Sequence, residues 1–255
     1  GDRVGPGPVV AGFAVAALAL VTFLLVEHRT PEPMLPLGLF RNRPFSGSLT
    51  AQFAISAGLF ASYLYATLYL QRVLGLSAIE AGLVYLPATF VNFATAACTG
   101  VLAQRGVSNR AMIGGGLLLV AVGMALVTLG TVDSSWVMIE PGMIVAMAGT
   151  GLLNPTAVAV ALESVPQEQS GLAAGTMDTF RQAGIAIGVA GLGALIPAST
   201  GLGSADPAAF VDGLHTAMWV GAAVSLGGAL AAFRLLRSAR RPAVAVATRA
   251  SEAPA

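Results

Sequence analysis

Seven long stretches of consecutive apolar residues constrain this chain more than any other feature of its sequence. A helix needs about 20 apolar residues to cross a hydrocarbon core of roughly 30 Å. Only 10% of the 255 residues are charged, too few for the polar surface of a soluble domain. A transmembrane barrel needs alternating segments of about 10 residues, which these consecutive runs do not provide. The sequence therefore predicts an all-α membrane protein of about seven transmembrane helices, at Val9–Val26, Ser46–Leu70, Ala81–Ala103, Ala111–Gly130, Trp136–Leu162, Gly171–Pro197 and Leu214–Leu236.

The arginines are distributed unevenly between the two sets of loops. One set carries only Arg3 and Arg72, and the opposite set carries most of the others. Because cytoplasmic loops are enriched in basic residues, the arginine-rich set is expected to be cytoplasmic. We therefore expect a multi-pass protein of the cell membrane, with the N-terminus of this chain outside and its C-terminus inside. The cytoplasmic set comprises Arg29, Arg41, Arg43, Arg105, Arg110, Arg234, Arg237, Arg240, Arg241 and Arg249.

The composition argues against several classes of function. All 13 basic residues are arginine, and without lysine there is neither a Walker A loop nor a Schiff-base nucleophile. The single cysteine, Cys98, excludes an internal disulfide and a cysteine-rich zinc site. A net charge of +1 argues against a nucleic-acid partner, and the isolated His28 and His215 argue against a metal site. We expect no enzymatic activity, no cofactor and no metal.

Loop composition divides the chain into four regions. Residues 1–30 are expected to form a single transmembrane helix, and residues 31–45 a Pro-rich cationic linker on the cytoplasmic face. Residues 46–237 contain the six remaining helices, and residues 238–255 form a tail rich in Ala, Arg and Pro. The tail has no apolar run and is expected to be a disordered cytoplasmic segment.

Charged residues within apolar stretches are costly in a bilayer and are candidates for function. Asp178 and Arg181 are three residues apart on one helix face and can pair. They are interpreted either as a structural or gating charge near the cytoplasmic interface or as residues facing a transport cavity. Glu140 follows Trp136 at the outer end of the fifth stretch. It is either a wetted carboxylate at the outer rim or a protonatable or cation-binding group in an outward-facing vestibule.

Neutral polar residues also lie at helical spacing within the stretches. Asn92 shares a face with Thr95 in the third stretch, and this face is expected to line a cavity or to bind a neighbouring helix. Asn154 precedes Pro155, which frees a backbone carbonyl in the fifth stretch. Gln52, in the second stretch, is a weaker candidate for the same kind of polar contact or cavity position.

Two further patterns each allow a structural or a functional interpretation. Phe90 and Phe93 are candidates for an apolar wall around a hydrophobic substrate, or they face lipid or core. The GIAIG step at Gly184–Gly188 is typical of close helix packing.

Three segments of the chain carry a family resemblance. They are PMLPLGLFRNRPF (Pro33–Phe45), LYLQRVLGLSAIEAGLVYLP (Leu68–Pro87) and SVPQEQSGLAAGTMDTFRQAGIAIGVAGLGAL (Ser164–Leu195). The most specific pieces are the LPLGLFRNRPF linker and the sixth-helix stretch with Arg181, Gln182 and Gly184. Together the segments resemble the C-terminal half of a major facilitator superfamily transporter of the fourteen-spanner drug:proton antiporter type. The resemblance implies that the first helix is an extra central span and that the other six form the C-terminal bundle.

The same resemblance implies a cytoplasmic loop motif in GVLAQRGVSNR (Gly100–Arg110). Gly100, Arg105 and Arg110 agree with the family pattern, whereas Gln104 replaces its acidic residue. Gln104 carries no charge, so it cannot make the charge contact that the acid makes between helices in the family.

The resemblance implies a secondary active transporter, present here as a partial chain, that exports amphipathic drugs or small molecules in exchange for protons by alternating access. The expected partners are the lipid bilayer, protons, a small-molecule substrate, and the missing N-terminal half or a complementing chain. The alternative is a non-transporting membrane scaffold or assembly module, or an inactive truncated transporter.

Overall fold

The computed structural model describes residues 37–131, 134–193 and 207–236, together with isolated positions between 12 and 29. The helix expected at Val9–Val26, apart from those isolated positions, and the tail 238–255 lie outside the described residues. In the described ranges the chain forms helices and no strand. The helices are α2 (Arg43–Ile55), α3 (Ala61–Leu68), α4 (Ala78–Val84), α5 (Leu86–Gln104), α6 (Asn109–Val127), α7 (Glu140–Glu163), α8 (Ser170–Gly193) and α9 (Pro207–Leu235).

Two π-helical turns join and extend the first long helix. The turn Ser56–Phe60 connects α2 to α3, and the turn Tyr69–Val73 follows α3, so that one continuous helix runs from Arg43 to Val73. A π turn inside an α-helix is often found at a functional position.

Local sequence signals account for the helix boundaries. Ser77 forms a capping box at the start of α4, because its hydroxyl accepts the Glu80 N–H at 3.3 Å and the Glu80 carboxylate accepts the Ser77 N–H at 2.8 Å. Ser108 caps α6 through the Ala111 N–H at 3.2 Å. The turn between α5 and α6 needs Gly106, whose φ of +85° is unfavourable for other residues.

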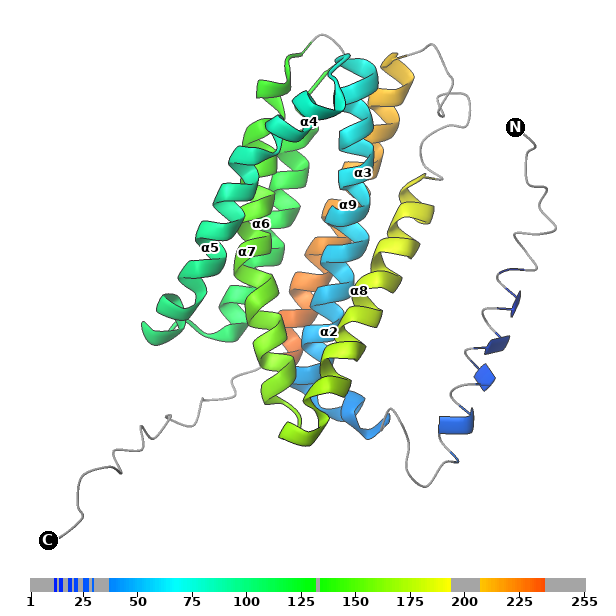
Figure 1. Cartoon of the computed structure of the whole chain (residues 1–255), viewed down its shortest axis with the longest axis vertical. Coiled ribbons are helices and arrows are strands. Elements are labelled where there is room, and N and C mark those ends of the chain that lie inside the picture. Colours follow the sequence, from blue (N-terminus) through cyan, green and yellow to red (C-terminus); the bar gives the residue numbers. More distant parts are fainter. Residues whose placement is uncertain are drawn as a thin grey trace, which may run out of the picture.

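The helices form two layers. In the first layer, α7 lies between α5 and α2, and α8 packs on the other side of α2; in the second, α6 packs on both α7 and α9, and α9 packs on α2. Figure 1 shows α5 and α8 at opposite edges of this assembly. The fully buried side chains come from both layers and include Leu49, Ile55, Tyr69, Leu70, Ile113, Leu117 and Leu153.

Helices α6 and α7 approach each other along a seam of glycines. A Cβ atom placed on Gly116 would lie 2.6 Å from the carbonyl oxygen of Gly149, and one on Gly123 would lie 2.5 Å from that of Gly142. Placed on Gly142, a Cβ would in turn lie 2.7 Å from the Gly123 oxygen. Small residues allow this backbone-to-backbone packing in membrane helices, where lipid leaves little hydrophobic drive for association.

Five helical segments are long and apolar enough to cross a membrane. They are Arg43–Val73, Ala78–Gln104, Asn109–Val127, Glu140–Glu163 and Ala208–Leu235. Each overlaps one of the predicted stretches. The sixth predicted stretch is also helical, as α8, but it is not among these five segments, and it contains Asp178, Arg181 and Gln182.

Most of the described loop arginines lie at one end of the helices. Arg43 begins α2, Arg105 follows α5, and Arg234 lies in the last turn of α9. Arg110, near the start of α6, lies with its guanidinium 5.5 Å from the ring centroid of Phe233 in α9, which ties those two helix ends together. Arg72 lies at the opposite end of the long helix, in the turn Tyr69–Val73.

Candidate functional site

Helix α5 packs on one side only. Its main neighbour in the described chain is α7, and Ala88 is its only residue that the described structure buries. Phe90 and Phe93 are 69% and 68% exposed, so these two candidates for a substrate wall point away from the bundle. Their exposure is compatible with contact to lipid or to another protein segment.

Helix α8 presents a polar face that the other described helices do not cover. Asp178, Thr179 and Gln182 are exposed there. The Arg181 guanidinium donates two hydrogen bonds to Oδ1 of Asp178, one of them from Nε at 3.0 Å, and the two side chains are 41% and 56% exposed. The predicted pair therefore forms within one helix, and its charges lie on the surface of this bundle.

The opposite face of α8 is packed tightly against the long helix. A Cβ on Gly184 would lie 2.7 Å from the carbonyl oxygen of Phe53 and 2.8 Å from Cβ of Ser56. Tyr65 of α3 donates a hydrogen bond of 2.7 Å to the carbonyl oxygen of Val189. Close packing at the start of the GIAIG step is thus present, and it fixes which face of α8 turns outward.

Asn92 joins α5 to α7. Its side-chain amide donates to the carbonyl oxygen of Met147 at 3.0 Å. Thr95 donates to the carbonyls of Val91 and Asn92 in its own helix, at 2.9 and 3.0 Å. A Cβ on Gly151 of α7 would collide with Thr95 Oγ1 and the Asn92 carbonyl. Of the two interpretations of this polar stripe, the geometry favours helix–helix attachment.

Replacing Asn92 with alanine is expected to lower the free energy of unfolding by about 1 kcal/mol, because a single interhelical hydrogen bond in a membrane contributes on that order. The matched control is Thr99→Val, since Thr99 donates only to Ala96 of its own helix, at 2.7 Å. Thermal unfolding in detergent, followed by size-exclusion chromatography, measures both. Equal midpoints for the two variants would show that the Asn92 bond does not hold α5 in place.

The remaining amide candidates lie inside the bundle. Gln52 is 4% exposed, and Ser56, one turn later, is fully buried at the contact with α8. Asn154 has a buried Oδ1 that finds no hydrogen-bond partner in the described part of the chain. It precedes Pro155, which lies inside α7 and lacks the N–H that would satisfy the carbonyl four residues earlier.

Glu140 is buried rather than wetted. It is the first residue of α7 and is 8% exposed, and neither carboxylate oxygen has a hydrogen-bond partner within the described ranges. The carboxyl group is therefore not wetted within this bundle, while neighbouring Trp136 is 38% exposed. Trp is common at membrane interfaces.

Two tyrosines that no sequence pattern singled out lie within electrostatic range of the buried carboxyl group. They are Tyr63 of α3 and Tyr85, between α4 and α5. Their rings stack with centroids 4.4 Å apart and an interplanar angle of 26°. The Tyr85 hydroxyl is 2.8 Å from Oγ1 of Thr67. The sequence pattern that could have indicated this cluster is the spacing of Tyr63 and Thr67, which lie four residues apart on one helix.

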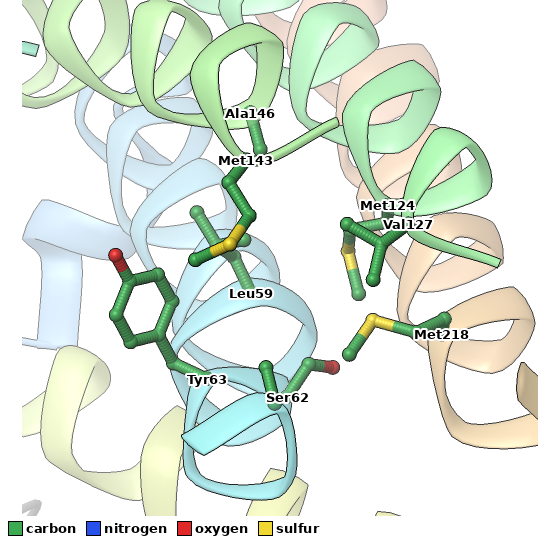
Figure 2. A pocket seen from close by; sticks show the side chains of 9 residues that line it. Leu59, Ser62, Tyr63, Met124, Val127, Met143, Ala146 and Met218 are labelled. Atoms are coloured by element: carbon green, nitrogen blue, oxygen red, sulfur yellow. The ribbon is translucent and has the colours of Figure 1, made fainter. Parts of the chain in front are cut away.

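A small apolar pocket begins next to this group. Figure 2 shows Tyr63 and Met143 on one side of the pocket and Met124 and Met218 on the other, with the Tyr63 hydroxyl pointing away from the methionines. The lining comes from α3, α6, α7 and α9, and from the π turn. Flexible thioethers suit such a space, because methionine adapts to irregular shapes. The full lining is Leu59, Ser62, Tyr63, Ala66, Met124, Val127, Met143, Ala146 and Met218.

The loop between α5 and α6 holds the predicted motif in an exposed position. Gly100, Gln104 and Arg105 are exposed, and Gly100 has open space where a Cβ would lie. Arg110 is partly buried over Phe233. The motif therefore forms a surface at the arginine-rich end of the helices.

Comparison with known proteins identifies the relatives of this chain. Residues 5–189 match the family model described as Major Facilitator Superfamily. The chain is 31% identical over 244 residues to a methylenomycin A resistance protein of Streptomyces coelicolor, covering 95% of this chain and 49% of that protein. It is 32% identical to the multidrug efflux pump LfrA of Mycolicibacterium smegmatis, covering 87% of this chain and 43% of the pump.

A third relative is the puromycin resistance protein of Streptomyces alboniger. It is 33% identical over 229 residues, which cover 86% of this chain and 45% of that protein. The chain thus spans about half or less of the length of these curated relatives.

Proposed function

The chain belongs to the major facilitator superfamily, and on that premise we propose that it is the C-terminal half of a proton-coupled exporter of small amphipathic molecules. Its substrate would bind between this bundle and the missing N-terminal half, and alternating access would carry the substrate out. The names of three relatives, which refer to multidrug efflux and to resistance against puromycin and methylenomycin A, support this class of substrate.

The polar outer face of α8 is the observation that carries the proposal. An exposed Asp178–Arg181 pair with Gln182 beside it would be costly against hydrocarbon. Such a face belongs against a water-filled cavity or another protein segment. A second helical bundle packed against the layer of α5, α7, α2 and α8 would provide the protein contact. A water-filled path between the two bundles, through which the transported molecule moves, would hydrate the charged pair.

The arginine-rich end of the helices is proposed to face the cytoplasm. Arg43, Arg105, Arg110 and Arg234 lie at that end, and basic residues are retained on the cytoplasmic side during insertion. This orientation places the C-terminus of the chain inside and its N-terminus outside. It also places Glu140 near the outer face and the Asp178–Arg181 pair nearer the cytoplasm.

Arg181 is proposed to hold the inward-facing gate by exchanging its intrahelical partner Asp178 for a group on the other half. Arg181→Ala is expected to lower efflux about tenfold at matched protein level, a typical coupling between two states. Arg234→Ala is the matched control, because Arg234 is exposed at the end of α9 in the second layer. Efflux by Arg181→Ala equal to that of the wild type and of the control would contradict the gating role.

The proposed function is tested by dye or drug uptake into inverted membrane vesicles with a proton gradient. The full-length transporter that contains this chain should accumulate puromycin or a fluorescent amphipathic cation, and a protonophore should abolish the accumulation. This chain alone should not accumulate either compound, and co-expression with the missing half should restore uptake. Full activity of the chain alone, or gradient-independent uptake by the full-length protein, would overturn the proposal.

A further inference from the structure

We propose that the carboxyl group of Glu140 is a proton-binding site of this half, situated at the outer ends of α3, α5 and α7. A proton would bind to one carboxylate oxygen and later leave it, with no other bond made or broken. The role of this site rests on the proposed function, because an exporter driven by protons must take them up from the outer side. The existence of the site does not depend on that function.

The burial of this carboxyl group is the first observation. The side chain is 8% exposed, and both oxygens are buried without a hydrogen-bond partner in the described part of the chain. An ionised carboxylate held in this way loses its hydration without compensation, which is costly. A protonated carboxylic acid avoids most of that cost. The ionised and the protonated forms of Glu140 therefore differ in free energy within the bundle, and the protonated form is the more favourable.

Among the described residues, two phenols interact electrostatically with Glu140. They are Tyr63 of α3 and Tyr85 at the junction of α4 and α5. Gly123 and Val127 of α6, which pack on the first turn of α7, carry no ionisable group. These four neighbours therefore supply no positive charge to the carboxyl group.

The surroundings fit a proton better than a metal ion or an organic cation. A Ca²⁺ ion takes six to eight oxygen ligands, whereas this site offers one carboxylate and the hydroxyls of neighbouring tyrosines. The adjacent pocket is lined by Met143, Met124 and other apolar groups, and little polar surface faces it. A proton requires only a carboxylate oxygen and an occasional path for water.

Protonation of Glu140 would change how α3, α5 and α7 pack against one another. Tyr63 lines the small apolar pocket and interacts electrostatically with the carboxyl group. Tyr85 links the start of α5 to α3 through its contact with Thr67. A change of charge at Glu140 therefore changes the free energy of packing at the outer ends of α3, α5 and α7. A site that favours one of two packings when protonated shifts the equilibrium between them.

Infrared difference spectroscopy on the reconstituted full-length protein tests this inference without a substrate. A pH step in the wild type should produce a carboxylic-acid C=O band, and Glu140→Gln should abolish it. Glu140→Asp should retain a shifted band, which assigns the signal to this position even if packing changes. Glu80→Gln is the matched control, because Glu80 is an exposed carboxylate at the same end of the helices.

The outcomes separate this inference from the proposed function. Loss of the band in Glu140→Gln, with the band kept in Glu80→Gln, supports the site whether or not any compound is exported. An unchanged band in Glu140→Gln, or no carboxylic-acid band in the wild type, overturns the site. If the band behaves as expected and the wild type shows no proton-driven uptake of puromycin, the proposed function fails and the proton site stands.

Discussion

Gly116→Leu is expected to prevent the bundle from folding stably, with a loss of more than about 3 kcal/mol. A Cβ at this position would lie 2.6 Å from the carbonyl oxygen of Gly149 and 3.1 Å from Cβ of Leu153. Because the obstacle includes backbone, side-chain rotation cannot relieve it, and α6 would have to move away from α7. The unfolding midpoint in detergent, measured by fluorescence-detected size-exclusion chromatography, is the readout.

The adjacent glycine provides the control. Gly115 lies in the same helix and has no heavy atom within 4 Å of a placed Cβ, so Gly115→Leu adds the same side chain where space is open. This variant should elute as the wild type does and unfold within about 1 kcal/mol of it, as surface substitutions generally do. Similar losses in both variants would mean that leucine itself, rather than the α6–α7 contact, destabilises the helix.

Gly184→Leu is expected to displace α8 from the long helix and to abolish the proposed transport by the full-length protein. The new side chain would meet the Phe53 carbonyl oxygen at 2.7 Å and the Ala57 nitrogen at 3.3 Å. Overpacking of this kind costs about 1–3 kcal/mol or more. Since the outer face of α8 carries Asp178 and Arg181, a rotated or shifted α8 would also misplace the charge pair. Proton-driven uptake into inverted vesicles, normalised to protein level, measures the result.

Gly191→Leu is the matched variant on the same helix, because a Cβ on Gly191 meets nothing within 4 Å in the described residues. Its protein level and unfolding midpoint should match those of the wild type. If Gly184→Leu kept wild-type uptake and stability, the close contact between α8 and the turn Ser56–Phe60 would have no role in positioning the polar outer face of α8.

The helices were predictable because bilayer thickness sets the length of apolar sequence that a span requires. The predicted stretch Ser46–Leu70 lies inside the observed segment Arg43–Val73, and Ala81–Ala103 lies inside Ala78–Gln104. In these two segments the helix extends beyond the prediction because caps and prolines carry it past the apolar run. Ser77 and Glu80, for example, begin α4 before the hydrophobic residues start. The two π turns were not foreseen, since no residue pattern in the sequence marks them.

The candidate residues were found by sequence, but their surroundings were not. The spacing of Asp178 and Arg181 predicts their pairing, because residues three apart are neighbours on a helix. Local spacing cannot say whether Asn92 faces a cavity or α7, and its bond to Met147 comes from a residue 55 positions away. The same limit hid Tyr63 and Tyr85, since their approach to Glu140 depends on how three helices meet.

The sequence by itself determined that this chain is a helical membrane protein, where most of its helices run, and which few charges lie within them. These properties follow from composition and from the length of apolar runs, which act locally. Only the tertiary structure decided that Glu140 is buried without a hydrogen-bond partner in the described chain and that Asp178 and Arg181 lie on an uncovered face. The rotation of each helix about its axis sets both facts. That rotation is fixed by close contacts between distant glycines, such as Gly116 with Gly149, rather than by the hydropathy of either helix.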